Sequence, residues 1–118
     1  MTFAEAIEDE TNGEPILAVF IAGGRTAWNG GAYWSKEKDP ARTVPPGSLD
    51  IALSWSVARP LLNYRYNDGF GSQDCHDIIA WTESRVLLIH EYDGSTSVIW
   101  VPRNPPATQM AERTSVAV

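Results

Sequence analysis

Cysteine is nearly absent from the sequence, and this excludes two ways of stabilising a small protein. Cys75 is the only cysteine, so no disulfide can form within the chain. A zinc site built from several thiolates is excluded for the same reason, and the two histidines add few further ligands. We therefore expect neither a metal site nor a cofactor, and we interpret Cys75 as a small buried hydrophobic side chain.

Long hydrophobic runs are also lacking. The longest one, residues 16–22, is much shorter than the roughly 20 apolar residues that a membrane-spanning helix needs. Residues 1–10 contain no basic segment followed by an apolar stretch, so they do not have the pattern of a signal peptide. From these two absences we expect a cytoplasmic protein with no membrane partner.

Positive charge is scarce relative to negative charge. The chain has 9 Lys and Arg residues against 15 Asp and Glu residues, which gives a formal net charge of −6. Such a surface repels phosphate backbones, so we expect no direct binding to nucleic-acid backbones. Residues 1–14 hold only acidic charges, in the side chains Glu5, Glu8, Asp9, Glu10 and Glu14. We favour a solvated helix face here, and the alternative is a patch that imitates a polyanion in a basic groove of a partner.

The sequence does contain enough apolar side chains for one core. Its 118 residues, 43% of them hydrophobic, are sufficient for a single domain that folds without disulfides or a structural metal. We predict this globular domain over residues 1–103. The segment Asn104-Pro105-Pro106 ends the pattern of regular structure, so residues 104–118 are predicted to be a C-terminal tail.

The N-terminal third predicts one helix and one strand. Thr2 and Glu5 have the spacing of a capping box, and Asn12-Gly13 provides a stop, so we expect a short helix over residues 3–10. Residues 16–22 are apolar on both faces and partly β-branched. This pattern is typical of a strand that is covered on both sides, and we predict a central strand there.

The middle of the chain is harder to interpret. Residues 25–48 are rich in Gly, Pro and aromatic residues and predict a long irregular excursion. Large apolar residues then alternate with small or polar ones over residues 49–58, which favours a strand, and a helix over residues 48–58 is the alternative. We expect Pro60 to interrupt either element. Apolar alternation resumes at Leu62, Tyr64 and Tyr66.

The clearest pattern is an antiparallel meander of three strands over residues 76–102. Two short turns, Glu83-Ser84 and Asp93-Gly94, separate its strands, and the second turn is a strong type I′ signal. Counting outward from the turns places Ile79 opposite Leu88. The predicted fold class is therefore α+β and mostly β. It has an antiparallel sheet of four to six strands, a short N-terminal helix and the excursion over residues 25–48.

The same register predicts which side chains share a face of the sheet. One face holds Ile79, Trp81, Val86, Leu88, Ile99 and Val101, and the other holds Ile78, Ala80, Leu87, Ile89, Val98 and Trp100. Both faces are apolar near Trp81 and Trp100 and polar near His90. We therefore expect the sheet to be covered on both faces at the Trp81/Trp100 end and open at the His90 end.

A row of polar residues across the meander has the composition of a hydrolase triad. Asp77, His90 and Ser97 follow one another on neighbouring strands, with the imidazole in the middle. No oxyanion hole or Gly-x-Ser-x-Gly motif accompanies them, so we interpret the row as polar surface and expect no catalytic residue. A small hydrolase that uses this row is the alternative. Cys75 and His76 would point to opposite faces of a strand and are not expected to act as a pair.

Aromatic residues outside the predicted sheet carry the main functional hypothesis. Trp28, Tyr33 and Trp34 lie in the excursion, where no periodicity explains them, and such side chains are enriched at binding interfaces. A hydrophobic lid over the sheet is the competing interpretation. We predict a small acidic, non-catalytic protein-binding module that uses these aromatic residues together with Glu8, Asp9 and Glu10.

The type of binding protein is less defined. An inhibitor or accessory protein of phage or mobile-element type fits the small size and the lack of catalytic motifs. A carbohydrate-binding module is another alternative, because flat aromatic faces beside Asn and Asp suit sugars. We expect a protein partner, and a homo-oligomer is compatible with the sequence.

Overall fold

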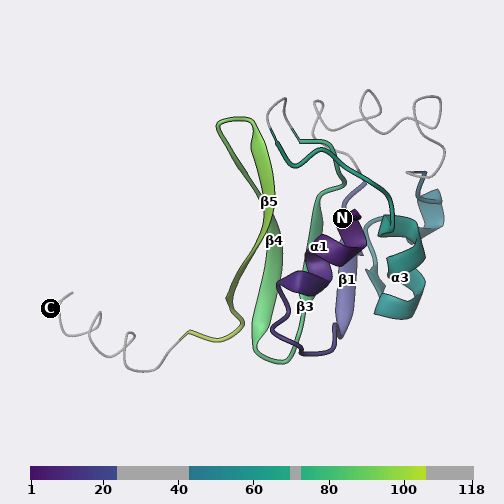
Figure 1. Cartoon of the computed structure of the whole chain (residues 1–118). Coiled ribbons are helices and arrows are strands. Elements are labelled where there is room, and N and C mark those ends of the chain that lie inside the picture. Colours follow the sequence, from purple (N-terminus) through teal and green to yellow (C-terminus); the bar gives the residue numbers. More distant parts are fainter. Residues whose placement is uncertain (24–42, 70–72, 106–118) are drawn as a thin grey trace, which may run out of the picture.

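Five antiparallel strands form one sheet with the order β2-β1-β3-β4-β5 (Figure 1). The structure is a computed structural model, which describes residues 1–23, 43–69 and 73–105. Its strands are β1 (Ala18–Ile21), β2 (Ala52–Leu53), β3 (Ile78–Trp81), β4 (Arg85–Tyr92) and β5 (Ser95–Pro102), and its helices are α1 (Phe3–Asp9), the 3₁₀ turn η2 (Pro46–Ser48) and α3 (Trp55–Leu62). The predicted α+β, mostly β fold class is confirmed.

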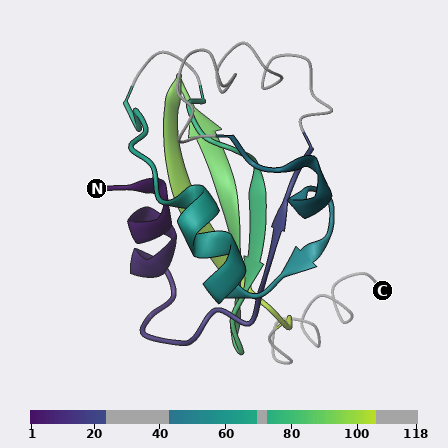
Figure 2. The same ribbon diagram turned by 90° about the vertical axis from the view of Figure 1, so that its right-hand side faces the viewer.

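Both α-helices lie on the same side of the sheet (Figure 1, Figure 2). Phe3 and Ile7 of α1 and Leu62 of α3 are fully buried there. They form one core with the sheet residues Val19, Ile21, Ile78, Ala80, Leu87 and Val98. Burying one such large side chain stabilises a fold by about 1.5–3 kcal/mol, so this helix-covered face provides most of the core.

The predicted N-terminal helix is confirmed together with its cap. The Glu5 backbone N–H donates to the Thr2 hydroxyl at 3.2 Å, and the Thr2 backbone N–H donates to the Glu5 carboxylate at 2.7 Å. These two bonds satisfy amides that the first helical turn leaves without partners. Asn12 and Gly13 then adopt positive φ angles of 56° and 79°, as expected for a helix stop.

The predicted meander is confirmed with its register. Ile79 pairs with Leu88, and Leu88 pairs with Ile99 on the next strand. Asp93 and Gly94 have φ angles of 52° and 82°, which fits the type I′ turn. The correct turn lengths explain this success, because two-residue loops fix every cross-strand neighbour of a hairpin.

The predicted strand over residues 49–58 is wrong for most of its length. Only Ala52 and Leu53 form a strand, and helix α3 begins at Trp55, after an extended Ser54. Trp55, Ala58 and Leu62 pack toward the core because they also have the spacing of one helical face. The alternating pattern fitted both periodicities, and packing against α1 and β1 favours the helix.

Pro60 does not end an element, contrary to expectation, but lies inside α3. A proline at this position removes a hydrogen bond to the carbonyl of Ser56. Ser56 and Pro60 are both exposed, so water can solvate the carbonyl group. The alternation at residues 62–66 also forms no strand. Leu62 ends the helix, and only an isolated bridge between Thr2 and Arg65 follows.

Several predictions fall mainly outside the described residues. The excursion is described only from residue 43 onward, so Trp28, Tyr33 and Trp34 are not among the residues placed. Of the predicted tail over residues 104–118, only Asn104 and Pro105 are described. Within the described ranges, no helix has the length and apolar character required to cross a bilayer.

Candidate functional site: the open face of the sheet

The side of the sheet that faces away from the helices is apolar across four strands. Side chains alternate along each strand, so every second residue points to this side. We call it the open face and define it by eight residues: Ala18 and Phe20 of β1, Ile79 and Trp81 of β3, Val86 and Leu88 of β4, and Ile99 and Val101 of β5. None of the eight carries a charge or a side-chain oxygen.

Strand pairing brings these side chains together in two parallel rows. One row joins Phe20, Ile79, Leu88 and Ile99, and the other joins Ala18, Trp81, Val86 and Val101. Facing residues on neighbouring strands have Cβ atoms about 4.5–5.5 Å apart, so each row is continuous. The two rows therefore form one apolar surface.

The open face is much less buried than the helix-covered face. Along β1, Val19 and Ile21 are fully buried, whereas the alternate residues Ala18 and Phe20 are only partly buried. On β5, Val101 is 40% exposed. No helix among the described elements packs on this side (Figure 1, Figure 2). The expectation that residues 16–22 form a strand covered on both faces is thus wrong for Ala18 and Phe20.

The expected coverage of the two sheet ends is wrong for part of the sheet, although His90, Glu91, Tyr92 and Ser97, at the end predicted to be open, are exposed. Thr96 and His76, near the end predicted to be open, are only 2% and 6% exposed. Trp100, near the end predicted to be covered, is 42% exposed, with the Arg85 guanidinium 3.8 Å from its ring centroid. The described helices cover one face of the sheet rather than one end of it. Both faces of the strands carry apolar residues, so the sequence could not indicate which face the helices cover.

The polar row of Asp77, His90 and Ser97 borders the open face but forms no linked triad. His90 pairs with Ser97 across β4 and β5, while β3 begins only after Asp77. The Asp77 carboxylate accepts a hydrogen bond from Gln73 Nε2 at 2.7 Å. Within the described part of the chain, no hydrogen bond joins the side chain of the exposed His90 to the side chain of either of the other two residues.

Three hollows lined by described residues lie mainly away from this row. One, of about 390 Å³, is lined by Met1 and residues 65–68. The other two, about 290 and 150 Å³, lie beside α1. Ser97 lines the smallest of these three, but Asp77 and His90 line none of them, so none of the three brings the row together in a substrate cleft.

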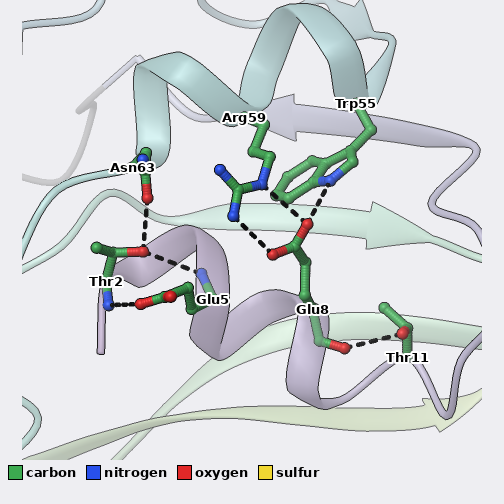
Figure 3. A network of polar contacts seen from close by, with 7 residues as sticks. All are labelled: Thr2, Glu5, Glu8, Thr11, Trp55, Arg59 and Asn63. Carbon is green, nitrogen blue, oxygen red and sulfur yellow. Dashed lines mark hydrogen bonds and ion pairs between the residues drawn. The ribbon is translucent and has the colours of Figure 1, made fainter.

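The acidic residues expected to bind a partner lie on the helix side, away from the open face. Glu8 accepts two hydrogen bonds from the Arg59 guanidinium, at 2.9 and 3.0 Å, and a third from Trp55 Nε1 at 3.1 Å (Figure 3). The bond from Arg59 is the main reason why the pKa of Glu8 is lowered. This carboxylate joins α1 to α3, whereas Asp9 is exposed and Glu10 is partly buried.

Cys75 and His76 belong to the interior of the helix side. Cys75 is fully buried in the core, as expected for a small hydrophobic side chain. His76 Nδ1 lies 2.7 Å from the Tyr64 hydroxyl, which also accepts the His76 backbone N–H at 2.9 Å. These contacts fasten the segment after α3 to the start of β3. Across the residues that the structure places, no three His, Cys, Asp or Glu side chains gather as metal ligands.

The sequence predicted that six of the eight residues share one face, but not that Ala18 and Phe20 join them or that the described helices leave this face uncovered. The sequence did contain a signal for this. Only one short N-terminal helix was predicted, and one short helix cannot cover both faces of a five-stranded sheet. Comparisons with protein-family models, curated proteins and solved structures give no match.

Proposed function

We propose that this protein is a non-catalytic protein-binding domain and that its open face is the interface. One observation carries the proposal. Eight apolar side chains lie in two rows across four strands, and no described helix covers them. A contiguous apolar surface is costly to leave in water, and in proteins it commonly marks an interaction site.

The shape and chemistry of the face favour a protein over other ligands. Small molecules bind in concave sites, whereas the face of a sheet offers a broad surface. Sugars need polar groups beside aromatic rings, and the open face has mainly aliphatic side chains with one Phe and one Trp. An apolar protein surface can pack against such a face as the inner layers of a β-sandwich do.

Two matched variants test the proposal. Val101→Glu places a charge on the open face, and Val57→Glu places one on α3; the two valines are 40% and 50% exposed. Each variant and the unchanged chain are used as bait in an extract of the native host, and the captured proteins are quantified by mass spectrometry. We expect at least one protein to be retained by the unchanged chain and Val57→Glu and lost with Val101→Glu. Equal capture by all three baits would contradict the proposal.

A further inference from the structure

We infer that the open face binds a second copy of this chain, so that two sheets pack face to face in a symmetric dimer. This inference rests on the proposed function and names the partner. Three properties of the described residues support it: the size of the face, its lack of charge in an acidic molecule, and the match between its residues and their own symmetry mates.

The size of the face is sufficient for a small dimer interface. Strands lie about 4.8 Å apart and extend about 3.4 Å per residue, so β1, β3, β4 and β5, counted at full length with the polar border near His90 included, present roughly 400 Å² of flat sheet. Side chains standing out from the sheet add to this area. Two copies together thus bury on the order of 1,000 Å², the lower end for a specific interface, so we expect a weak dimer with a dissociation constant in the micromolar range.

The charge distribution favours contact through this face. Each copy has a formal net charge of −6, so two copies repel one another over most of their surfaces. The two rows of the open face contain no charged side chain. Two identical acidic molecules can therefore approach there with the least repulsion, and burying apolar side chains drives the association.

The face is also self-complementary about a two-fold axis that runs parallel to the strands between the two sheets. Such an axis reverses the strand order but keeps each row in place, so β3 lies on β4 of the second copy and β1 lies on its β5. Trp81 then packs on Val86 of the second copy, and Ala18 packs on its Val101. Large side chains meet smaller ones in these two pairs, and in the other row Phe20 packs on Ile99 and Ile79 on Leu88, so every contact is apolar.

The polar border of the face matches under the same symmetry. Asp77 precedes β3 and His90 lies near the end of β4, so the two-fold axis brings each Asp77 close to His90 of the second copy. A carboxylate can accept a hydrogen bond from an imidazole N–H, whereas two carboxylates repel one another. This pairing favours the strand-parallel axis over one that would place the two carboxylates together.

Sedimentation equilibrium of the full chain tests the dimer. We expect the unchanged protein and Val57→Glu to dimerise with similar micromolar constants. Val101→Glu buries an unpaired charge in the interface, so we expect its dissociation constant to rise by about 100-fold or more. Far-ultraviolet circular dichroism verifies that each variant is folded. Val86→Thr, which keeps the shape and β-propensity of valine, weakens the dimer in the same direction and provides a second, milder change.

Two outcomes would overturn the inference. One is an unchanged chain that stays monomeric up to about 1 mM, well above the micromolar constant expected for this interface. The other is a dimer that Val101→Glu and Val86→Thr leave as stable as Val57→Glu does. If the chain is monomeric but Val101→Glu still abolishes capture of another protein, the open face binds a different partner and the proposed function stands. If neither self-association nor capture depends on Val101, both proposals fail.

Discussion

Glu8 is the residue with the most connections between the two helices. It accepts hydrogen bonds from Arg59 and Trp55, so it joins α1 to α3 across 51 and 47 residues of sequence (Figure 3). The Glu8 and Arg59 side chains are both 38% exposed, so water screens their attraction. Two bonds in fork geometry still make this pair more specific than a typical surface ion pair.

Replacing Glu8 with glutamine should lower the free energy of unfolding by about 0.5–1 kcal/mol near neutral pH, after allowance for solvent screening. The pKa of Glu8 is lowered in the folded protein, so its stabilisation is present above the unfolded pKa, near 4.5, and is lost as the pH falls through the folded value. The difference between the two proteins should therefore disappear in acid. Urea unfolding at several pH values measures it. Glu83→Gln, at an exposed turn position, is the matched control, and a constant difference at all pH values would contradict the account.

Glu14 has a comparable role at the turn between β3 and β4. Its carboxylate accepts hydrogen bonds from the Thr82 hydroxyl at 2.6 Å, from the Ser84 backbone N–H at 3.2 Å, and from the Ser84 hydroxyl at 2.7 and 2.9 Å. These bonds, with that of Thr82 the largest cause, lower the pKa of Glu14. The loop after α1 is thereby fastened to the meander.

Glu14→Gln should loosen this turn without unfolding the protein. An amide oxygen is a weaker acceptor than a carboxylate, and its NH₂ group cannot accept from Ser84. We expect the Ser84 amide to exchange its hydrogen several-fold faster, as the loss of about 1 kcal/mol of local stability implies. Hydrogen exchange followed by NMR measures this. Unchanged exchange at Ser84, with the Thr96 amide in β5 as an internal reference, would show that the carboxylate is not needed.

At the scale of elements, α3 is stable despite Pro60. The proline is exposed, and Ala58 and Leu62 on the other side of the helix are fully buried. Packing of these two side chains therefore outweighs the lost hydrogen bond and explains why a helix forms where proline was expected to interrupt it. Tertiary contacts contribute more to the stability of a short helix than intrinsic propensity does.

Pro60→Ala should increase the stability of the protein. Alanine restores the hydrogen bond to the Ser56 carbonyl and has a far better helix propensity, although the variant also gives the unfolded chain more freedom. We expect the free energy of unfolding to rise by about 1–2 kcal/mol, which urea or thermal unfolding can measure. Pro45→Ala, outside any α-helix, should give no such gain. A loss of stability in Pro60→Ala would mean that the backbone at this position is not helical in solution.

How much of each element could be predicted depends on how local its determinants are. The capping box of α1, the positive φ at Asn12 and Gly13, and the Asp93-Gly94 turn each depend on a few adjacent residues, and all were predicted. The identity of α3 was not, because residues 49–62 fit two periodicities and contact with α1 and β1 selects one. Nor could the sequence indicate which sheet face the helices cover, since Leu87 and Leu88 are equally apolar and only packing makes one fully buried.

At the scale of the whole molecule, the described residues form a two-layer arrangement in which both α-helices lie on one side of the sheet. Domains are normally built so that both apolar faces of a sheet are covered, and an antiparallel sheet with one solvated face usually carries polar residues there. Here the face away from the helices is apolar in both of its rows. The described residues thus form one half of a layered structure, and a second copy of the chain would complete it.

Contact between the two copies can be observed directly by NMR. Within one chain, Ala18 on β1 and Val101 on β5 are three strand spacings apart, about 14 Å, which is too far for their methyl groups to show a nuclear Overhauser effect. In the proposed dimer the Ala18 methyl group packs against Val101 of the second copy. We predict an isotope-filtered nuclear Overhauser effect between these methyl groups in a mixture of labelled and unlabelled protein. Its absence in a folded sample, at a concentration well above the expected dissociation constant, would contradict the account.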